Sequence, residues 1–165
     1  MRCVLIVALI VFSHLAASSA LAGRVEDRES LRRLPGVEVI VETFLAEEEA
    51  AGFSRDAIRA GVELVLQSNG VKILSGSERL ETSSTPFLYV KVNPLKHSSA
   101  DTYCLAIVVE LHQAVSLLNR PEQRMSARTW NRVQIAMIGE QITGRVNELV
   151  EPLIKQFAND FLTVN

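Results

Sequence analysis

The feature that most constrains this chain is a run of apolar side chains at every second position between residues 103 and 118. Its apolar members are Leu105, Ile107, Val109, Leu111, Val115 and Leu117, with Gln113 as the one break. Successive side chains of a β-strand point to opposite faces, so this period predicts a long strand with one buried face. A chain with such a strand must build a sheet and cover one face of it.

Shorter segments supply the rest of that sheet. Further strands are predicted over 37–44, 71–74, 87–93 and 124–130. The segment 131–138 fits a strand through its alternation and also fits the start of a helix, and both assignments stay open. Asn119 to Glu122 is expected to form the turn that returns the chain after the long strand.

Two helices are predicted, one before the middle strand and one at the C-terminus. The first begins after Ser54, a good N-cap, and ends at Asn69-Gly70, where glycine tolerates a left-handed conformation. The second follows a helical period from about Gly139 to Phe161. Pro152 lies inside it and is expected to kink the helix near Leu149 or to divide it into two.

Together these elements predict the α+β class, with the order β-α-β-β-β-β-α. We expect a mixed sheet of four or five strands with the two helices packed on one face. Residues 34–165 form a single domain, and the charged segment 23–33 is expected to be a flexible arm.

The N-terminus has the three parts of a secretory signal peptide. Arg2 supplies a positive charge, Cys3 to Phe12 is apolar throughout, and Ala20-Leu21-Ala22 matches the motif for cleavage before Gly23. We therefore predict that residues 1–22 are removed and that the product is periplasmic or secreted, with no membrane span after cleavage. The alternative is an uncleaved N-terminal membrane anchor that uses the same apolar run.

Charge and cysteine content narrow the function classes further. Without residues 1–22 the chain has 16 basic and 19 acidic side chains, a net charge of −3. That balance argues against nucleic-acid binding, which needs clustered lysines and arginines. Cys104 is then the only cysteine left, so no internal disulfide is possible, and we expect it to be a buried apolar side chain.

The face of the sheet opposite the helices is the predicted interaction surface. Its members mix aromatic, aliphatic and charged groups, a pattern typical of a protein docking surface and equally of a solvated face with cross-strand charge pairs such as Lys91 with Glu110. The candidate residues are Ile40, Phe87, Tyr89, Lys91, Val108, Glu110 and His112.

No catalytic, metal or cofactor motif stands out. His97, Ser98 and Asp101 lie in one polar loop, which rarely provides the rigid frame that a nucleophile triad needs. Glu110 and His112 share a face of one strand, but a stable metal site needs three or four ligands. We therefore predict neither metal nor cofactor, and no enzyme activity. The alternative is a small periplasmic hydrolase or ligand-binding protein with a site near His97 or His112.

One set of short stretches comprises Leu34-Pro35-Gly36-Val37, Pro86 to Val92, Val109-Glu110-Leu111, Thr129-Trp130 and Phe157 to Leu162. Together these stretches resemble an uncharacterised family of single-domain secreted bacterial proteins. The resemblance implies no activity and no catalytic residues. The element order is also similar to envelope accessory domains such as the N-terminal domain of TolB, which is a likeness of fold alone.

These expectations lead to one functional hypothesis. The chain is predicted to be an exported, non-enzymatic accessory protein of the bacterial cell envelope, which binds a protein partner through the exposed sheet face or an edge. The sequence leaves the partner and the oligomeric state open.

Overall fold

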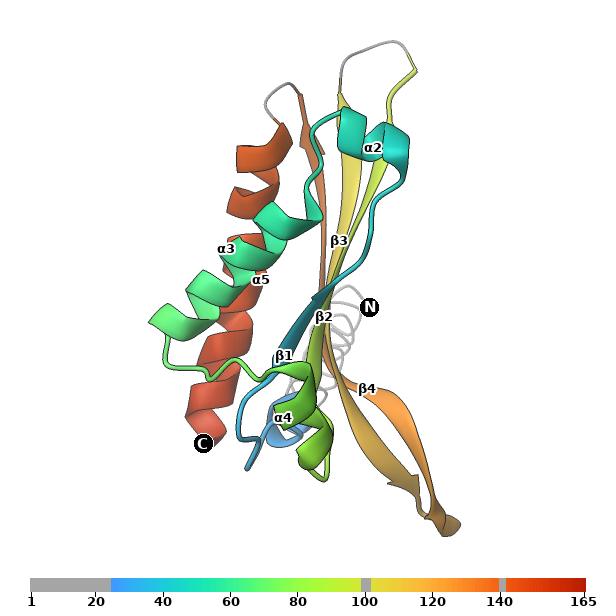
Figure 1. The fold of residues 1–165 in the computed structure, drawn as a ribbon, viewed down its shortest axis with the longest axis vertical. Coiled ribbons are helices and arrows are strands. Elements are labelled where there is room, and N and C mark those ends of the chain that lie inside the picture. The colour runs from blue at the N-terminus through green and yellow to red at the C-terminus, as the bar shows by residue number, and fades with distance from the viewer. Residues whose placement is uncertain (1–24, 99–101, 140–141) are drawn as a thin grey trace, which may run out of the picture.

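Four strands form one mixed sheet in the order β1-β2-β3-β4 (Figure 1). The computed structural model describes residues 25–98, 102–139 and 142–165. The strands are β1 (Glu38–Val41), β2 (Phe87–Lys96), β3 (Tyr103–Leu117) and β4 (Arg120–Ile138). β1 runs parallel to β2, while β2 with β3 and β3 with β4 are antiparallel. The predicted α+β class and the mixed sheet are confirmed, with four strands.

The long alternating segment is the central strand of the core. In β3, Leu105, Ile107, Val109 and Leu111 are fully buried, as their period predicts. The pattern weakens after Gln113, because the β3–β4 hairpin extends past Phe87 at the start of β2 and leaves the core (Figure 1). Val115 and Leu117, which were expected to face inward, are accordingly only half-buried.

Two helices cover one face of this sheet, as predicted. They are α3 (Arg55–Ser68) and α5 (Ile142–Val164), which lie side by side on the same side of the sheet (Figure 1). The Ser54 side chain accepts a hydrogen bond from the backbone N–H of Ala57, so the predicted N-cap is confirmed. α5 contains Pro152 and is still one helix, so the alternative of two separate helices is wrong.

Burial explains why α5 continues through its proline. Proline removes one backbone donor, which costs helix stability. Beyond it, Ile154, Phe157 and Ala158 are fully buried against the sheet and α3. Packing of an apolar helix face contributes more than local propensity does, and here it outweighs the lost hydrogen bond.

Two short helices lie in the connection from β1 to β2, one before and one after α3. They are α2 (Ala46–Ala50), which carries Glu47, Glu48 and Glu49, and α4 (Gly76–Glu81). The strand predicted over 71–74 is wrong, because only a single bridge joins Val37 to Ile73. Val71 and Leu74 are buried in the core as parts of a loop instead.

The N-terminal segment of the described chain packs against the core. Residues 25–29 are helical and Leu31 is fully buried, so the prediction of a flexible arm over 23–33 is wrong for the residues that the structure describes. The predicted signal peptide, residues 1–22, and its cleavage site before Gly23 lie outside the described residues. Among the described helices, none combines the length and apolar composition that a bilayer span requires.

The ambiguous segment 131–138 is a strand. β4 runs without interruption from Arg120 to Ile138, so the turn predicted over Asn119 to Glu122 is wrong in its bounds and lies at Leu118 and Asn119. Trp130 and Ile138 are buried on the core face, while Val133, Ile135 and Met137 alternate with them on the other face. The strand period therefore holds to the end of β4.

Candidate interaction surface

The side of the sheet that faces away from α3 and α5 is here called the reverse face. It holds all seven residues of the predicted surface, and each of them is half-buried. Register brings them into adjacent rows, since Tyr89 lies between Ile40 on β1 and Glu110 on β3. Phe87 lies opposite His112 and Lys91 opposite Val108 in the same strand pair. The residues that sequence alternation grouped are therefore neighbours in space.

Aromatic rings fill one end of the reverse face. The rings of Phe87 and His112 are stacked, with centroids 5.0 Å apart and an interplanar angle of 8°. Tyr89 meets the edge of His112 at 6.2 Å, and the guanidinium of Arg79 from α4 lies 5.5 Å from the centroid of Phe87. These contacts explain why Phe87 and Tyr89 are half-buried although no helix of the core layer covers them.

Charge pairs surround the aromatic rings. Glu110 pairs with Arg128 of β4 at 2.8 Å, and its other oxygen lies 3.0 Å from His112 Nε2. Lys91 pairs with Glu42 at 2.9 Å. Lys91 and Glu110 thus have separate partners, Glu42 and Arg128, in place of the cross-strand pair that the sequence suggested.

These pairs move the ionisation of the groups involved. Burial alone would raise the pKa of Glu110, but hydrogen bonds from Arg128 and His112 outweigh it and lower the pKa below its ordinary value. The hydrogen bond and the charge of Glu42 raise the pKa of Lys91. Burial, with the nearby Glu42, raises the pKa of Tyr89. The polar part of the reverse face is therefore a set of fixed ion pairs at neutral pH.

The other end of the reverse face is apolar and open to solvent. Leu95 is 72% exposed, Val133 57%, Ile135 73% and Met137 69%. Cross-strand register makes them one patch, because Leu95, Cys104 and Met137 form one row and Ala106 with Ile135 the next. We call this set the apolar patch, and its members are Leu95, Cys104, Ala106, Val108, Val133, Ile135 and Met137.

Sequence reasoning found only the edge of this patch. Of its members, Val108 alone was among the predicted surface residues. The signal was present in the alternation of Val133, Ile135 and Met137, but the helical alternative for 131–138 hid it. Cys104, expected to be buried, is half-buried within the patch.

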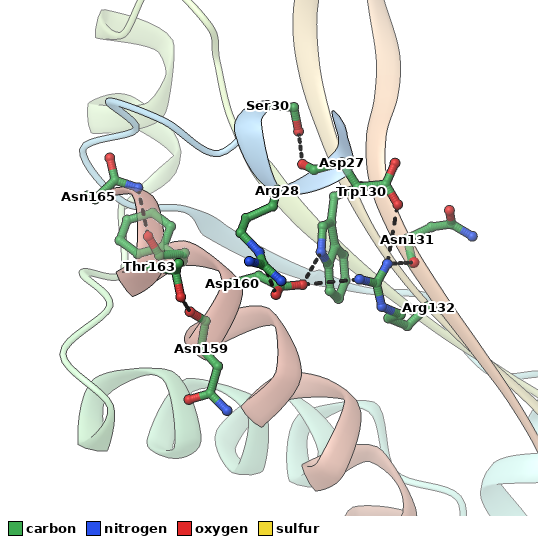
Figure 2. A network of polar contacts seen from close by, with 11 residues as sticks. Asp27, Arg28, Ser30, Trp130, Asn131, Arg132, Asn159, Asp160, Thr163 and Asn165 are labelled. Carbon is green, nitrogen blue, oxygen red and sulfur yellow. Dashed lines mark hydrogen bonds and ion pairs between the residues drawn. The ribbon is translucent and has the colours of Figure 1, made fainter. Parts of the chain in front are cut away.

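A buried carboxylate holds the strand that carries the patch (Figure 2). Asp160 of α5 accepts hydrogen bonds from Trp130 Nε1 at 3.0 Å, Arg132 Nη2 at 3.1 Å and Arg28 Nε at 3.2 Å. Arg132 also contacts Asp27 at 3.3 Å, and its guanidinium lies 4.5 Å from the Trp130 ring centroid. Two carboxylates and two guanidinium groups thus neutralise each other where β4, α5 and the N-terminal segment meet.

A second polar contact explains the break in the long alternating run. Gln113 is buried and donates hydrogen bonds to the Ser30 carbonyl oxygen at 2.9 Å and to Thr129 Oγ1 at 2.7 Å. Ser30 in turn donates to the Thr129 carbonyl at 3.1 Å. The residue that seemed to interrupt β3 therefore fastens the N-terminal segment to the sheet.

The histidines of the alternative site lie far apart. His112 is opposite Phe87 at the start of β2, and His97 follows Lys96 at its end. Nine steps along a strand correspond to about 30 Å, so one small site does not include both side chains. Asp101 lies outside the described residues.

Cavity geometry and ligand clusters do not point to those histidines either. A cavity of about 130 Å³ lies between α3 and α5, lined by residues such as Val62, Leu64 and Ile154. Neither His97 nor His112 lines it. Within 25–98, 102–139 and 142–165, no group of three or more His, Cys, Asp and Glu side chains is arranged to hold a metal ion.

No protein-family model matches the chain, and a search of the curated proteins finds no match.

Proposed function

We propose that this chain is an exported, non-enzymatic accessory protein of the bacterial cell envelope that binds a partner protein through its reverse face. The observation that carries the proposal is the apolar patch, in which four large side chains are about half exposed or more on a sheet face that neither α3 nor α5 covers. Contiguous exposed apolar surface of this kind marks interaction sites in soluble proteins.

The surroundings of the patch support the same function. Lys91 with Glu42 and Glu110 with Arg128 form ion pairs next to it, so an apolar centre is bordered by a polar rim. That arrangement is typical of protein–protein interfaces, where apolar anchors supply the binding energy and polar groups set orientation. The patch also lies on strands rather than loops, so its side chains are held in fixed relative positions.

Export is the second part of the proposal, and it rests on the signal-peptide pattern of residues 1–22. The apolar run and the Ala20-Leu21-Ala22 motif are the supporting features. We expect N-terminal sequencing of the protein recovered from a bacterial periplasm or medium to begin at Gly23. Recovery of the chain only in the membrane fraction, with Met1 or Arg2 as its first residue, would support the anchor instead.

Substitution of Leu95 tests the docking surface. Leu95→Lys places a charge within the apolar patch, and we expect capture of the partner from a cross-linked envelope extract to fall at least tenfold, on the order of 1.4 kcal/mol. The same substitution at Leu64, which is 67% exposed on α3, serves as the matched control. Quantitative mass spectrometry of the captured proteins provides the measurement.

Proteins captured by the wild type, Leu64→Lys and Leu95→Lys show whether partners dock on the reverse face. A protein captured equally by the wild type and by Leu64→Lys, but lost with Leu95→Lys, supports docking on the reverse face. Equal recovery with all three chains argues that partners bind elsewhere, and the proposal then fails.

A further inference from the structure

The outer edge of β4 carries a segment without the features that normally protect a sheet edge. Exposed edge strands are usually blocked by charges, prolines, bulges or a covering element. The first part of β4 has Arg120, Arg124 and Arg128, together with two register shifts against β3. From Val133 to Ile138 the sequence is VQIAMI, with no charge, proline or glycine, and the pairing with β3 is regular.

The described chain leaves this segment paired on one side only. β4 is the last strand in the sheet order, and the backbone hydrogen bonds described for 133–138 are those of its ladder with β3. A short uncharged segment of β-branched and other apolar residues at an edge is the type of sequence that pairs with a further strand. The next step is to identify the strand that pairs with this segment.

We propose that the segment 133–137 pairs antiparallel with the same segment of a second copy of this chain, around a two-fold axis at Ile135. Residues directly opposite each other in an antiparallel pair share a face, so the axis must pass through a residue position. With the axis at Ile135, Val133 lies opposite Met137 of the partner subunit and Gln134 opposite Ala136 of the partner subunit. Every opposed pair in this core is uncharged.

Charge disfavours registers centred on the hairpin part of β4. An axis at Trp130 would place Arg128 opposite Arg132 of the partner subunit, and like charges opposite each other destabilise strand pairs. With the axis at Ile135, the arginines of the hairpin lie beyond the paired segment, so both copies retain the Glu110–Arg128 contact. The arginines therefore direct pairing toward the uncharged segment.

Pairing at this edge brings the two apolar patches together. Val133, Ile135 and Met137 of each copy lie on the reverse face, so the two sets become neighbours across the axis. The joined sheet has eight strands, and its reverse face stays open on both copies. This inference goes beyond the proposed function, because a dimer forms in it whether or not a partner protein docks on the patch.

Substitution at the axis gives a test that few other interfaces would mimic. Analytical ultracentrifugation of the purified wild type is expected to show a species of twice the chain mass. Ile135→Lys places two lysines face to face at the axis, and Ile135→Glu places two carboxylates there. Each is expected to weaken the dimer at least tenfold. Because Ile135 is 73% exposed within one copy, neither change should affect the fold, which circular dichroism checks.

Mixing the two variants decides between this interface and any other. Residue 135 faces its own copy in the proposed dimer, so equal amounts of Ile135→Lys and Ile135→Glu should recover the dimer as a mixed pair. Leu95→Lys is the matched control, since Leu95 shares the reverse face but lies on β2, and it should keep the wild-type mass. A wild type that stays monomeric at ~0.1 mM, or variants that fail to associate when mixed, would overturn the proposal.

Discussion

Asp160→Ala is expected to lower the free energy of unfolding by about 3–5 kcal/mol, because it leaves charged partners in the protein interior. The Asp160 side chain is 11% exposed and that of Arg132 14%, so water can replace little of the lost contact. Trp130 Nε1 loses its acceptor in the same step, and an unpaired buried donor carries a further cost. Arg28 also loses its ion pair at 3.2 Å.

The measurement is urea unfolding followed through Trp130, the only tryptophan in the chain. Glu148→Ala is the control, since its pair with Arg145 joins side chains that are 61% and 59% exposed and should contribute under about 1 kcal/mol. Asp160→Asn keeps an oxygen acceptor for Trp130 and should fall between the two. A loss below about 1 kcal/mol for Asp160→Ala would show that the network does not hold β4 to α5.

Phe157→Ala should cost a similar amount through loss of packing, about 3–5 kcal/mol. The ring is fully buried and meets Trp130 edge-on, with centroids 5.1 Å apart. It also lies 6.1 Å from the ring of Phe161 on the same helix. Removing it opens a cavity under the sheet that surrounding side chains can fill only in part, because the core is close-packed.

The control for this change lies on the same helix. Leu162→Ala removes a side chain that is 49% exposed, so its expected cost is well under half that of Phe157→Ala. Denaturant unfolding gives both values, and near-ultraviolet circular dichroism reports the packing of Trp130. Equal stability losses for the two substitutions would contradict the placement of Phe157 in the core.

The elements that sequence analysis predicted best are those with one solvent-exposed face and one buried face. β3 and α3 fall in this group, because burial on one face imposes a period on the residues themselves. The segment Val71 to Leu74 was assigned wrongly because it is too short for a periodic pattern. Three apolar residues and Lys72 are too few to define a period, and burial of Val71 and Leu74 in a loop requires the same composition as a strand.

The contacts that sequence analysis missed join residues far apart in the chain. Arg28 and Asp160 are 132 positions apart, as are the Arg33 backbone and Asn165, whose side-chain oxygen accepts its N–H. No local period records such pairs, so the N-terminal segment gave the pattern of a free charged arm. Only the fold shows that Leu31 is buried in the core and that Gln113 of β3 is hydrogen-bonded to the neighbouring Ser30.

Sequence analysis predicted the strand residues of the candidate site but not the contacts that other elements make with them. Alternation in β2 and β3 placed Tyr89 and His112 on one face correctly. It could not show that Arg79 would approach the ring of Phe87 or that Arg128 would pair with Glu110, because the positions of both arginines depend on the fold. The exposed apolar residues of β4 then form the open part of the surface, beside the predicted residues rather than among them.

The proposed function requires that the reverse face, at the apolar patch, contacts another protein in the cell. Site-specific photo-cross-linking from position 95 in living bacteria probes this contact, with position 64 on α3 as the comparison. We expect a discrete adduct, heavier than the chain and distinct from its self-dimer, from position 95 and none from position 64. Adducts from position 64 alone, or no adduct from position 95, would rule the contact out.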